Sequence, residues 1–103
     1  MFDQKQAEDC AVILAALAEQ NRIRIIECLR SGSKNVTQLS TLLDEEIVNV
    51  SHHLGVMRAA RVVVTEKKGR FVIYSLNPRY FVDEPSKSTM MDLGWCRIEI
   101  PHN

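Results

Sequence analysis

A change of hydrophobic period near residue 61 constrains the fold of this chain more than any other feature. Residues 47–60 are "IVNVSHHLGVMRAA", and their apolar residues repeat at the spacing of one buried helical stripe: Val50, Leu54 and Met57, with Ile47 at its edge. Beyond Arg61, "VVVTEK" and "RFVIYSL" are rich in β-branched and aromatic residues and flank a Lys68-Gly69 turn. The pattern predicts a long helix that leads directly into a β-hairpin.

Two shorter helices are expected just before this long one. Asn21 is placed to cap a helix over "RIRIIECLR", which Gly32 would stop. The apolar stripe expected on this helix consists of Ile23, Ile26 and Leu29. Thr37 is then expected to cap the short helix "QLSTLL". Because only "DEE" separates the short helix from the long one, the two are predicted to form a helix-turn-helix.

A first helix is predicted over residues 6–18, "QAEDCAVILAALA", which is apolar almost all round from Cys10 to Ala18. A helix that is apolar on every side needs packing partners on more than one side. We therefore expect it to pack on its own domain with one face and on another subunit with the other. Dimerisation is the first functional inference.

Charge is unevenly distributed along the chain. Its 103 residues suffice for one domain, and 13 Lys and Arg balance 13 Asp and Glu, so a basic signature of the whole molecule is absent. Residues 58–79, however, contain the single acid Glu66 and these bases: Arg58, Arg61, Lys67, Lys68, Arg70 and Arg79. Such a patch can bind phosphate locally while the acidic remainder repels it.

The sequence does not favour an enzyme, a membrane protein or a disulfide-rich protein. It has no Ser-His-Asp order, phosphate-binding glycine loop or paired carboxylate constellation, so we expect no catalytic residue and no cofactor. Three cysteines, Cys10, Cys28 and Cys96, are too few and too widely spaced for a disulfide framework. We find no signal peptide and no apolar run that spans a bilayer, and expect a cytoplasmic protein without a membrane partner.

Four stretches in this order and spacing resemble one bacterial family: "ALAEQNRIRIIECLRSG", "VTQLSTLL", "VSHHLGVMRAARVV" and "KKGRFVIYSLN". Over about residues 14–77 they resemble the ArsR-type (arsenic-repressor-like) winged-helix transcriptional regulators. The resemblance implies a mainly helical α+β fold, with four helices, a β-hairpin wing and a possible extra C-terminal strand. It also implies a homodimer, joined through the N-terminal helix and the C-terminal segment, that binds a palindromic double-stranded operator and usually represses transcription. We divide the chain into a winged-helix domain, residues 1–81, and a C-terminal tail, residues 82–103.

The adjacent histidines of the long helix are expected to have different roles. Adjacent helical residues point about 100° apart, so His52 and His53 make a poor chelator for one metal ion. His53 flanks the buried stripe and is expected to pack half-buried. The residues expected to face outward are Val48, Asn49, Ser51, His52 and Gly55.

The resemblance favours DNA contact by this outward face over an ordinary solvated surface. In a major groove His52, Ser51 and Asn49 can bond base edges or phosphates, and Val48 can touch a thymine methyl. In the wing, Arg70 can enter a minor groove while lysines contact phosphates, the alternative being a solvated hairpin tip. The predicted DNA-binding residues are Val48, Asn49, Ser51, His52, Arg58, Lys67, Lys68 and Arg70.

Four positions depart from the family pattern. Glu45 and Glu46 suit the dipole at the start of the long helix and can cap it, but they repel phosphates. Gly55 stands where many relatives have lysine, and Arg61 where a helix-ending glycine is usual. The wing must then supply much of the DNA affinity. The alternative is a winged-helix module repurposed for protein–protein interaction, with weak or no DNA binding.

The metal sites common in the family are not expected in this chain. The Cys-x-Cys site is replaced by "NVT" at residues 35–37, and a strand-like tail replaces the C-terminal helix that holds the other site. Cys10 and Cys96 remain as a speculative thiol sensor at the junction of the two terminal segments. The simpler alternative is that Cys10 is a small buried hydrophobe.

Overall fold

The computed structural model describes residues 4–81, 88–94 and 97–101 of the chain. Its elements are α1 (Gln4–Leu17), α2 (Gln20–Arg30), α3 (Val36–Leu43), α4 (Ile47–Ala59), β1 (Val63–Lys68), β2 (Phe71–Leu76), β3 (Ser88–Asp92) and β4 (Arg97–Pro101). Within these ranges four helices are followed by the antiparallel hairpin β1–β2, which we call the wing. The expected winged helix-turn-helix order is confirmed.

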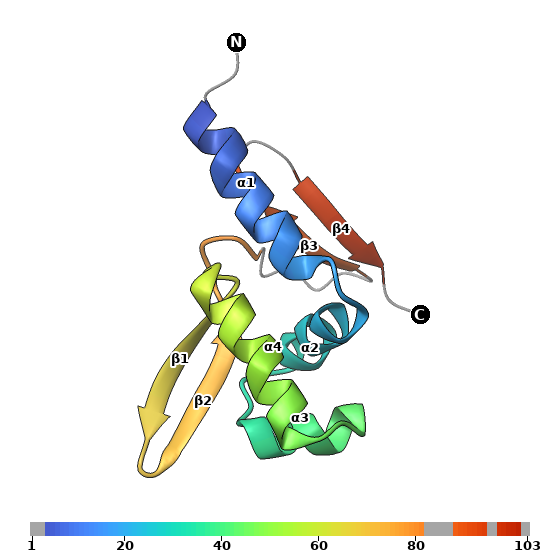
Figure 1. Cartoon of the computed structure of the whole chain (residues 1–103), viewed down its shortest axis with the longest axis vertical. Coiled ribbons are helices and arrows are strands. Elements are labelled where there is room, and N and C mark those ends of the chain that lie inside the picture. Colours follow the sequence, from blue (N-terminus) through green and yellow to red (C-terminus); the bar gives the residue numbers. More distant parts are fainter. Residues whose placement is uncertain (1–3, 82–87, 95–96, 102–103) are drawn as a thin grey trace.

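The molecule is elongated, 46 × 27 × 25 Å, and different helices and strands lie at its two ends (Figure 1). Figure 1 shows α1 and the hairpin β3–β4 at one end, and α3 with the tip of the wing at the other. One hydrophobic core joins the two ends. Its largest fully buried side chains are Ile25, Ile26, Leu39, Val50, Leu54, Met57, Val62, Val63 and Met91. Because Met91 belongs to β3, the C-terminal hairpin shares the core of the helices.

The residues that cap α2 and α3 differ from those expected. Glu19, not Asn21, is the N-cap of α2, and its carboxylate accepts hydrogen bonds from the backbone N–H of Asn21 at 2.8 Å and of Arg22 at 3.1 Å. Asn35, not Thr37, caps α3 in a reciprocal capping box with Gln38, both bonds being 2.9 Å. In each case an earlier side-chain oxygen accepts from the free N–H groups, so the helix begins two residues sooner.

The stripe expected on α2 was partly wrong. Ile26 and Leu29 are buried, but Ile25 is fully buried beside them and Ile23 is 39% exposed. The buried face of α2 is therefore formed by Ile25, Ile26 and Leu29 and is turned away from Ile23.

A tight junction joins α3 to α4, as expected for "DEE". Asp44 ends α3 in the left-handed conformation, with φ of 53°, and the backbone N–H of Glu45 donates to the carbonyl of Ser40 at 3.1 Å. An arginine from α2 also helps to close this end of α3, because Arg24 Nη2 donates to the carbonyl of Leu43 at 3.1 Å. Both acceptors lie in the last turn of α3, so these hydrogen bonds fix where α3 ends and the turn begins.

The C-terminal segment forms a second hairpin where one extra strand was expected. β3 pairs antiparallel with β4, from Ser88 opposite Pro101 to Asp92 opposite Arg97. Beyond the wing the chain returns to this hairpin, since the N–H of Asp92 donates to the carbonyl of Tyr80 at 2.7 Å and Phe81 bridges to Met91. Long-range contacts of this kind leave little signal in the local pattern.

The passage from α4 to β1 requires a left-handed residue, and that residue is Arg61, with φ of 64°. Its N–H donates to the carbonyl of Arg58 at 2.9 Å, and its own carbonyl accepts from Asn77 Nδ2 at 2.8 Å. A residue with a Cβ carries a cost of about 1–2 kcal/mol in this conformation, which glycine avoids. The hydrogen bonds on both sides of Arg61 hold it there.

Arg61→Gly is expected to raise the free energy of unfolding by about 0.5–1 kcal/mol, because the relief of strain exceeds the extra entropy that glycine gives the unfolded chain. Urea unfolding measures the change. Arg61→Ala is the matched control, since it removes the same side chain but keeps the Cβ, and it should give no gain. Equal stabilisation by both variants would contradict strain at this position.

Candidate nucleic-acid interface

The outer face of α4 presents a stripe of small and polar residues. Val48, Ser51, His52 and Gly55, which we call the outer stripe, follow one another at helical spacing and are all exposed, Val48 to 76%. On the opposite face Val50, Leu54 and Met57 are at most 1% exposed. Asn49 is also exposed, beside Val48. The orientation expected for α4 is confirmed.

The two histidines of α4 diverge as expected. Their ring centroids lie 5.8 Å apart and the rings are tilted by 58°. His52 is exposed, whereas the side chain of His53 is 15% exposed and its Nε2 lies 3.7 Å from Glu19 Oε2. His53 therefore packs α4 against the start of α2. Over the described ranges, no group of three His, Cys, Asp or Glu side chains is placed to hold a metal ion.

The glutamates before α4 do not cap it with their side chains. Glu46 is the N-cap residue, but its carboxylate makes no capping hydrogen bond, and Glu45 accepts from Asn21 Nδ2 at 3.3 Å instead. The first turn of α4 itself contains no acidic residue, and the basic residue of its last turn is Arg58. The capping role expected of these glutamates was wrong, because Glu45 is drawn toward α2.

The wing turn lies one residue later than expected. Lys68 pairs with Phe71, so the two central residues of the turn are Gly69 and Arg70 rather than Lys68 and Gly69. Gly69 has φ of 61°, the conformation that a tight hairpin requires at its first central position. The shift moves Lys68 onto the end of β1 and puts Arg70 at the tip.

Phe71 was missed as a candidate site residue. The guanidinium carbon of Arg70 lies 5.2 Å from the centroid of the Phe71 ring, within the range of a cation–π contact, and Phe71 is 46% exposed. This contact orients the arginine at the tip of the wing. The sequence did contain a signal for Phe71, namely an aromatic residue directly after the basic turn of the wing.

Figure 1 shows that α4 begins beside α3, at the end of the molecule that also holds the tip of the wing, and runs from there toward α1. The predicted residues on α4 and in the wing are Val48, Asn49, Ser51, His52, Arg58, Lys67, Lys68 and Arg70, and all are exposed.

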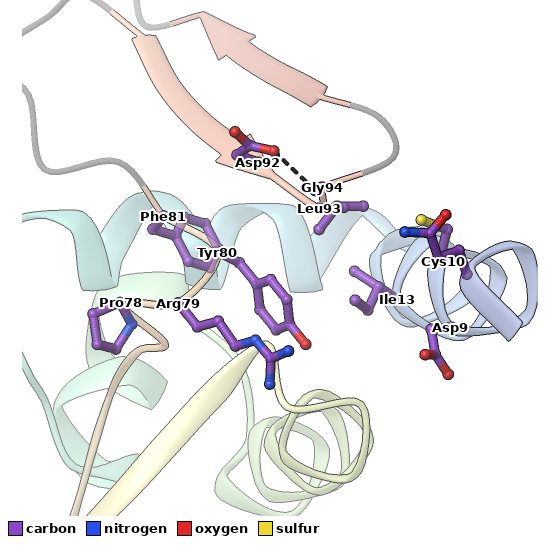
Figure 2. A pocket seen from close by; sticks show the side chains of 11 residues that line it. Asp9, Cys10, Ile13, Pro78, Arg79, Tyr80, Phe81, Asp92, Leu93 and Gly94 are labelled. Carbon is purple, nitrogen blue, oxygen red and sulfur yellow. Dashed lines mark hydrogen bonds between the residues drawn. The ribbon is translucent and has the colours of Figure 1, made fainter. Parts of the chain in front are cut away.

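The first helix has apolar residues on both sides, as expected. Cys10, Ile13, Ala16 and Leu17 are buried, yet Val12 is 56% and Leu14 is 43% exposed. Beside α1 lies a groove of about 610 Å³, bounded by Ile13, Tyr80 and Leu93 among others (Figure 2). Cys10 lines this groove. Cys96, its suggested partner in a thiol sensor, lies outside the described residues.

These features define a class of protein: a winged helix-turn-helix protein with a solvent-facing fourth helix and a positively charged wing. Residues 13–65 match the family described as "Bacterial regulatory protein, arsR family", and the chain belongs to this family. It is a family of transcriptional regulators, not of enzymes. None of the helices in the described ranges has the length and apolar character that crossing a membrane would need.

Relatives and solved structures agree with this assignment. The HTH-type transcriptional regulator NmtR of Mycobacterium tuberculosis is 39% identical over 75 residues, which are 73% of this chain but only 62% of NmtR. The transcriptional repressor PagR of Bacillus anthracis is 32% identical with a TM-score of 0.68, covering 73% of this chain and 86% of that one. The homodimeric winged helix-turn-helix DNA-binding domain Mb0332 of Mycobacterium bovis, at 23% identity and TM-score 0.68, covers 75% of this chain and 73% of its own and supports the fold.

Glu19→Ala is expected to lower the free energy of unfolding by about 1–2 kcal/mol, because two N–H groups of α2 lose their acceptor and His53 loses its carboxylate neighbour. Gln20→Ala, an exposed change in the same turn, should stay within about 0.5 kcal/mol of the wild type. Urea unfolding compares the two variants. Equal losses would show that Glu19 contributes no specific cap.

Proposed function

We propose that this chain is a homodimeric, sequence-specific DNA-binding transcriptional regulator that acts as a repressor in the cytoplasm. The observation that supports it best is that one family fold presents both an exposed outer stripe on α4 and an exposed basic wing tip. No catalytic residue and no cofactor enter the proposal.

In this proposal α4 is the recognition helix. Asn49, Ser51 and His52 offer hydrogen-bonding groups to base edges or phosphates, and Val48 offers an apolar contact to a thymine methyl. Arg58, in the last turn, is placed for a phosphate. The acids Asp44, Glu45 and Glu46 precede the helix and repel phosphate, so α4 would contribute more to specificity than to affinity.

In this proposal the wing contributes more to affinity than to specificity. Lys67 and Lys68 end β1 and contact flanking phosphates in the proposed complex, while Arg70 reaches the minor groove from the tip. The stacking of Arg70 on Phe71 holds the guanidinium before DNA arrives, which reduces the entropy lost on binding. These contacts depend on phosphate charge and groove shape rather than on base identity.

Dimerisation is proposed through α1 and the C-terminal segment. Val12 and Leu14 are large apolar side chains that solvent reaches in the single chain, and burying them against a second copy is favourable. Mb0332 is described as homodimeric. A twofold dimer would set two copies of α4 about 34 Å apart, one turn of a palindromic operator.

Lys68→Ala should weaken binding to the DNA upstream of the protein's own gene and reduce the slope of log K against log salt by about 0.9, because it removes one of the proposed phosphate contacts. Fluorescence anisotropy at several salt concentrations measures both. Arg30→Ala is the control, because it removes the same charge from the last turn of α2, outside the elements proposed for DNA contact and dimerisation. Binding no tighter than to random DNA, or equal slopes for both variants, would contradict the proposal.

Val12→Asp should convert the dimer to a monomer, because it places a charge in the proposed interface. Leu42→Asp is the matched control, since Leu42 is also 56% exposed but lies on α3. Light scattering gives the mass of each variant. A dimer that survives Val12→Asp, or that Leu42→Asp disrupts equally, would place the interface elsewhere.

A second candidate function is protein binding by a repurposed winged helix. It is favoured by one observation: apolar Leu42, Ile47 and Val48 are exposed around the helix-turn-helix, next to Asp44 and Glu46. On this alternative the pure protein captures a protein partner through this surface and ignores DNA. Specific DNA binding in the anisotropy titration would exclude it.

A further inference from the structure

We infer that the outer stripe of α4 reads its operator by close apolar approach, with Val48 packed on the C5-methyl of one thymine in each half-site. The inference rests on the proposed function and specifies the base pairs that the helix recognises. It follows from three features of α4: the charges it lacks, the exposure of Val48 and the presence of Gly55.

The first feature is the absence of bases from the part of α4 that would face base edges. Residues 47–57 contain no lysine or arginine, and Arg58 follows only in the last turn. The commonest specific contact in a major groove, a bidentate bond from arginine or lysine to guanine, is therefore not available there. Asn49 can pair with adenine and Val48 with the thymine methyl, so both adjacent residues favour A·T pairs.

The second feature is the exposure of Val48. At 76% it is the most exposed large apolar residue that the structure describes, and Ile47 beside it is 48% exposed. Water covers these methyl groups in the free protein, so a methyl group on the floor of the groove is a favourable partner. No lysine or arginine of the first turns competes for the position.

The third feature is Gly55, two turns along the same stripe. A Cβ built on Gly55 would meet nothing within 4 Å among the described residues, and its backbone lies outside the left-handed region. Packing within the chain therefore gives no reason for a glycine, which is a poor helix former. A surface outside the chain gives one, because a bare backbone lets α4 lie close to the floor of a groove.

Thymine replacement tests the contact of Val48. A duplex is first selected from a random library by binding to the wild-type protein, and each thymine is then replaced in turn by deoxyuridine, which lacks only the methyl. We expect one position in each half-site where the replacement weakens binding about fourfold, the effect of exposing one methyl-sized group. Val48→Ala should bind the thymine and deoxyuridine duplexes equally.

The outcomes separate the inference from the proposed function. If no duplex is enriched, sequence-specific DNA binding fails and the inference falls with it. If a duplex is enriched but no deoxyuridine position matters, or Val48→Ala shows the same loss as the wild type, DNA binding stands and methyl reading by Val48 is overturned.

Gly55→Ala provides an independent test, because it should raise the stability of the free protein and lower its affinity for DNA. The alanine should raise the urea midpoint of the free protein, because it favours the helix and its Cβ meets open space. Affinity for the selected duplex should fall at least tenfold, since the same Cβ would stand between α4 and the groove. Unchanged or higher affinity together with the raised midpoint would overturn the close approach.

Discussion

The burial of one side of α4 determines what its other side can do. Val50, Leu54 and Met57 are at most 1% exposed and pack into the core formed with α2, α3 and the wing. Because a helix has 3.6 residues per turn, holding this stripe inward also fixes the direction of Val48, Ser51 and His52. A slip of one residue would turn the outer stripe by about 100° and bury polar groups without partners. The rotation of the recognition helix is thus set by hydrophobic packing and not by any contact at its surface.

Those parts of the fold that depend on a strong local period were predictable from the sequence. The inner and outer faces of α4, the half-buried His53 and the wing all followed from spacing alone. The caps did not, because Glu19 and Asn35 lie just before Asn21 and Thr37 and can start the same helices earlier, and only backbone geometry decides between them. Such choices move a helix start by two residues without changing the fold.

Other features depended on pairing between distant residues. The wing turn could centre on Lys68-Gly69 or on Gly69-Arg70, and the register between β1 and β2 selects the second. That one-residue shift brings Arg70 against Phe71, a contact that no single-residue pattern indicates. The pairing of β3 with β4 was hidden for a similar reason, since Met91 is anchored by the core and Asp92 by the carbonyl of Tyr80.

In the proposed complex, different elements attract the phosphates and distinguish the bases, because the charges around α4 and on the wing have opposite signs. Asp44, Glu45 and Glu46 precede α4, while Lys67, Lys68 and Arg70 stand at the wing tip, so phosphate is repelled at one element and attracted at the other. Phosphate attraction holds any sequence equally, whereas contacts at base edges distinguish sequences. A helix that gains little from phosphates binds only where its base contacts are made. Because the net charge is near zero, general attraction to DNA of any sequence is weak. In the proposed complex, specificity would then depend on the few side chains of the outer stripe.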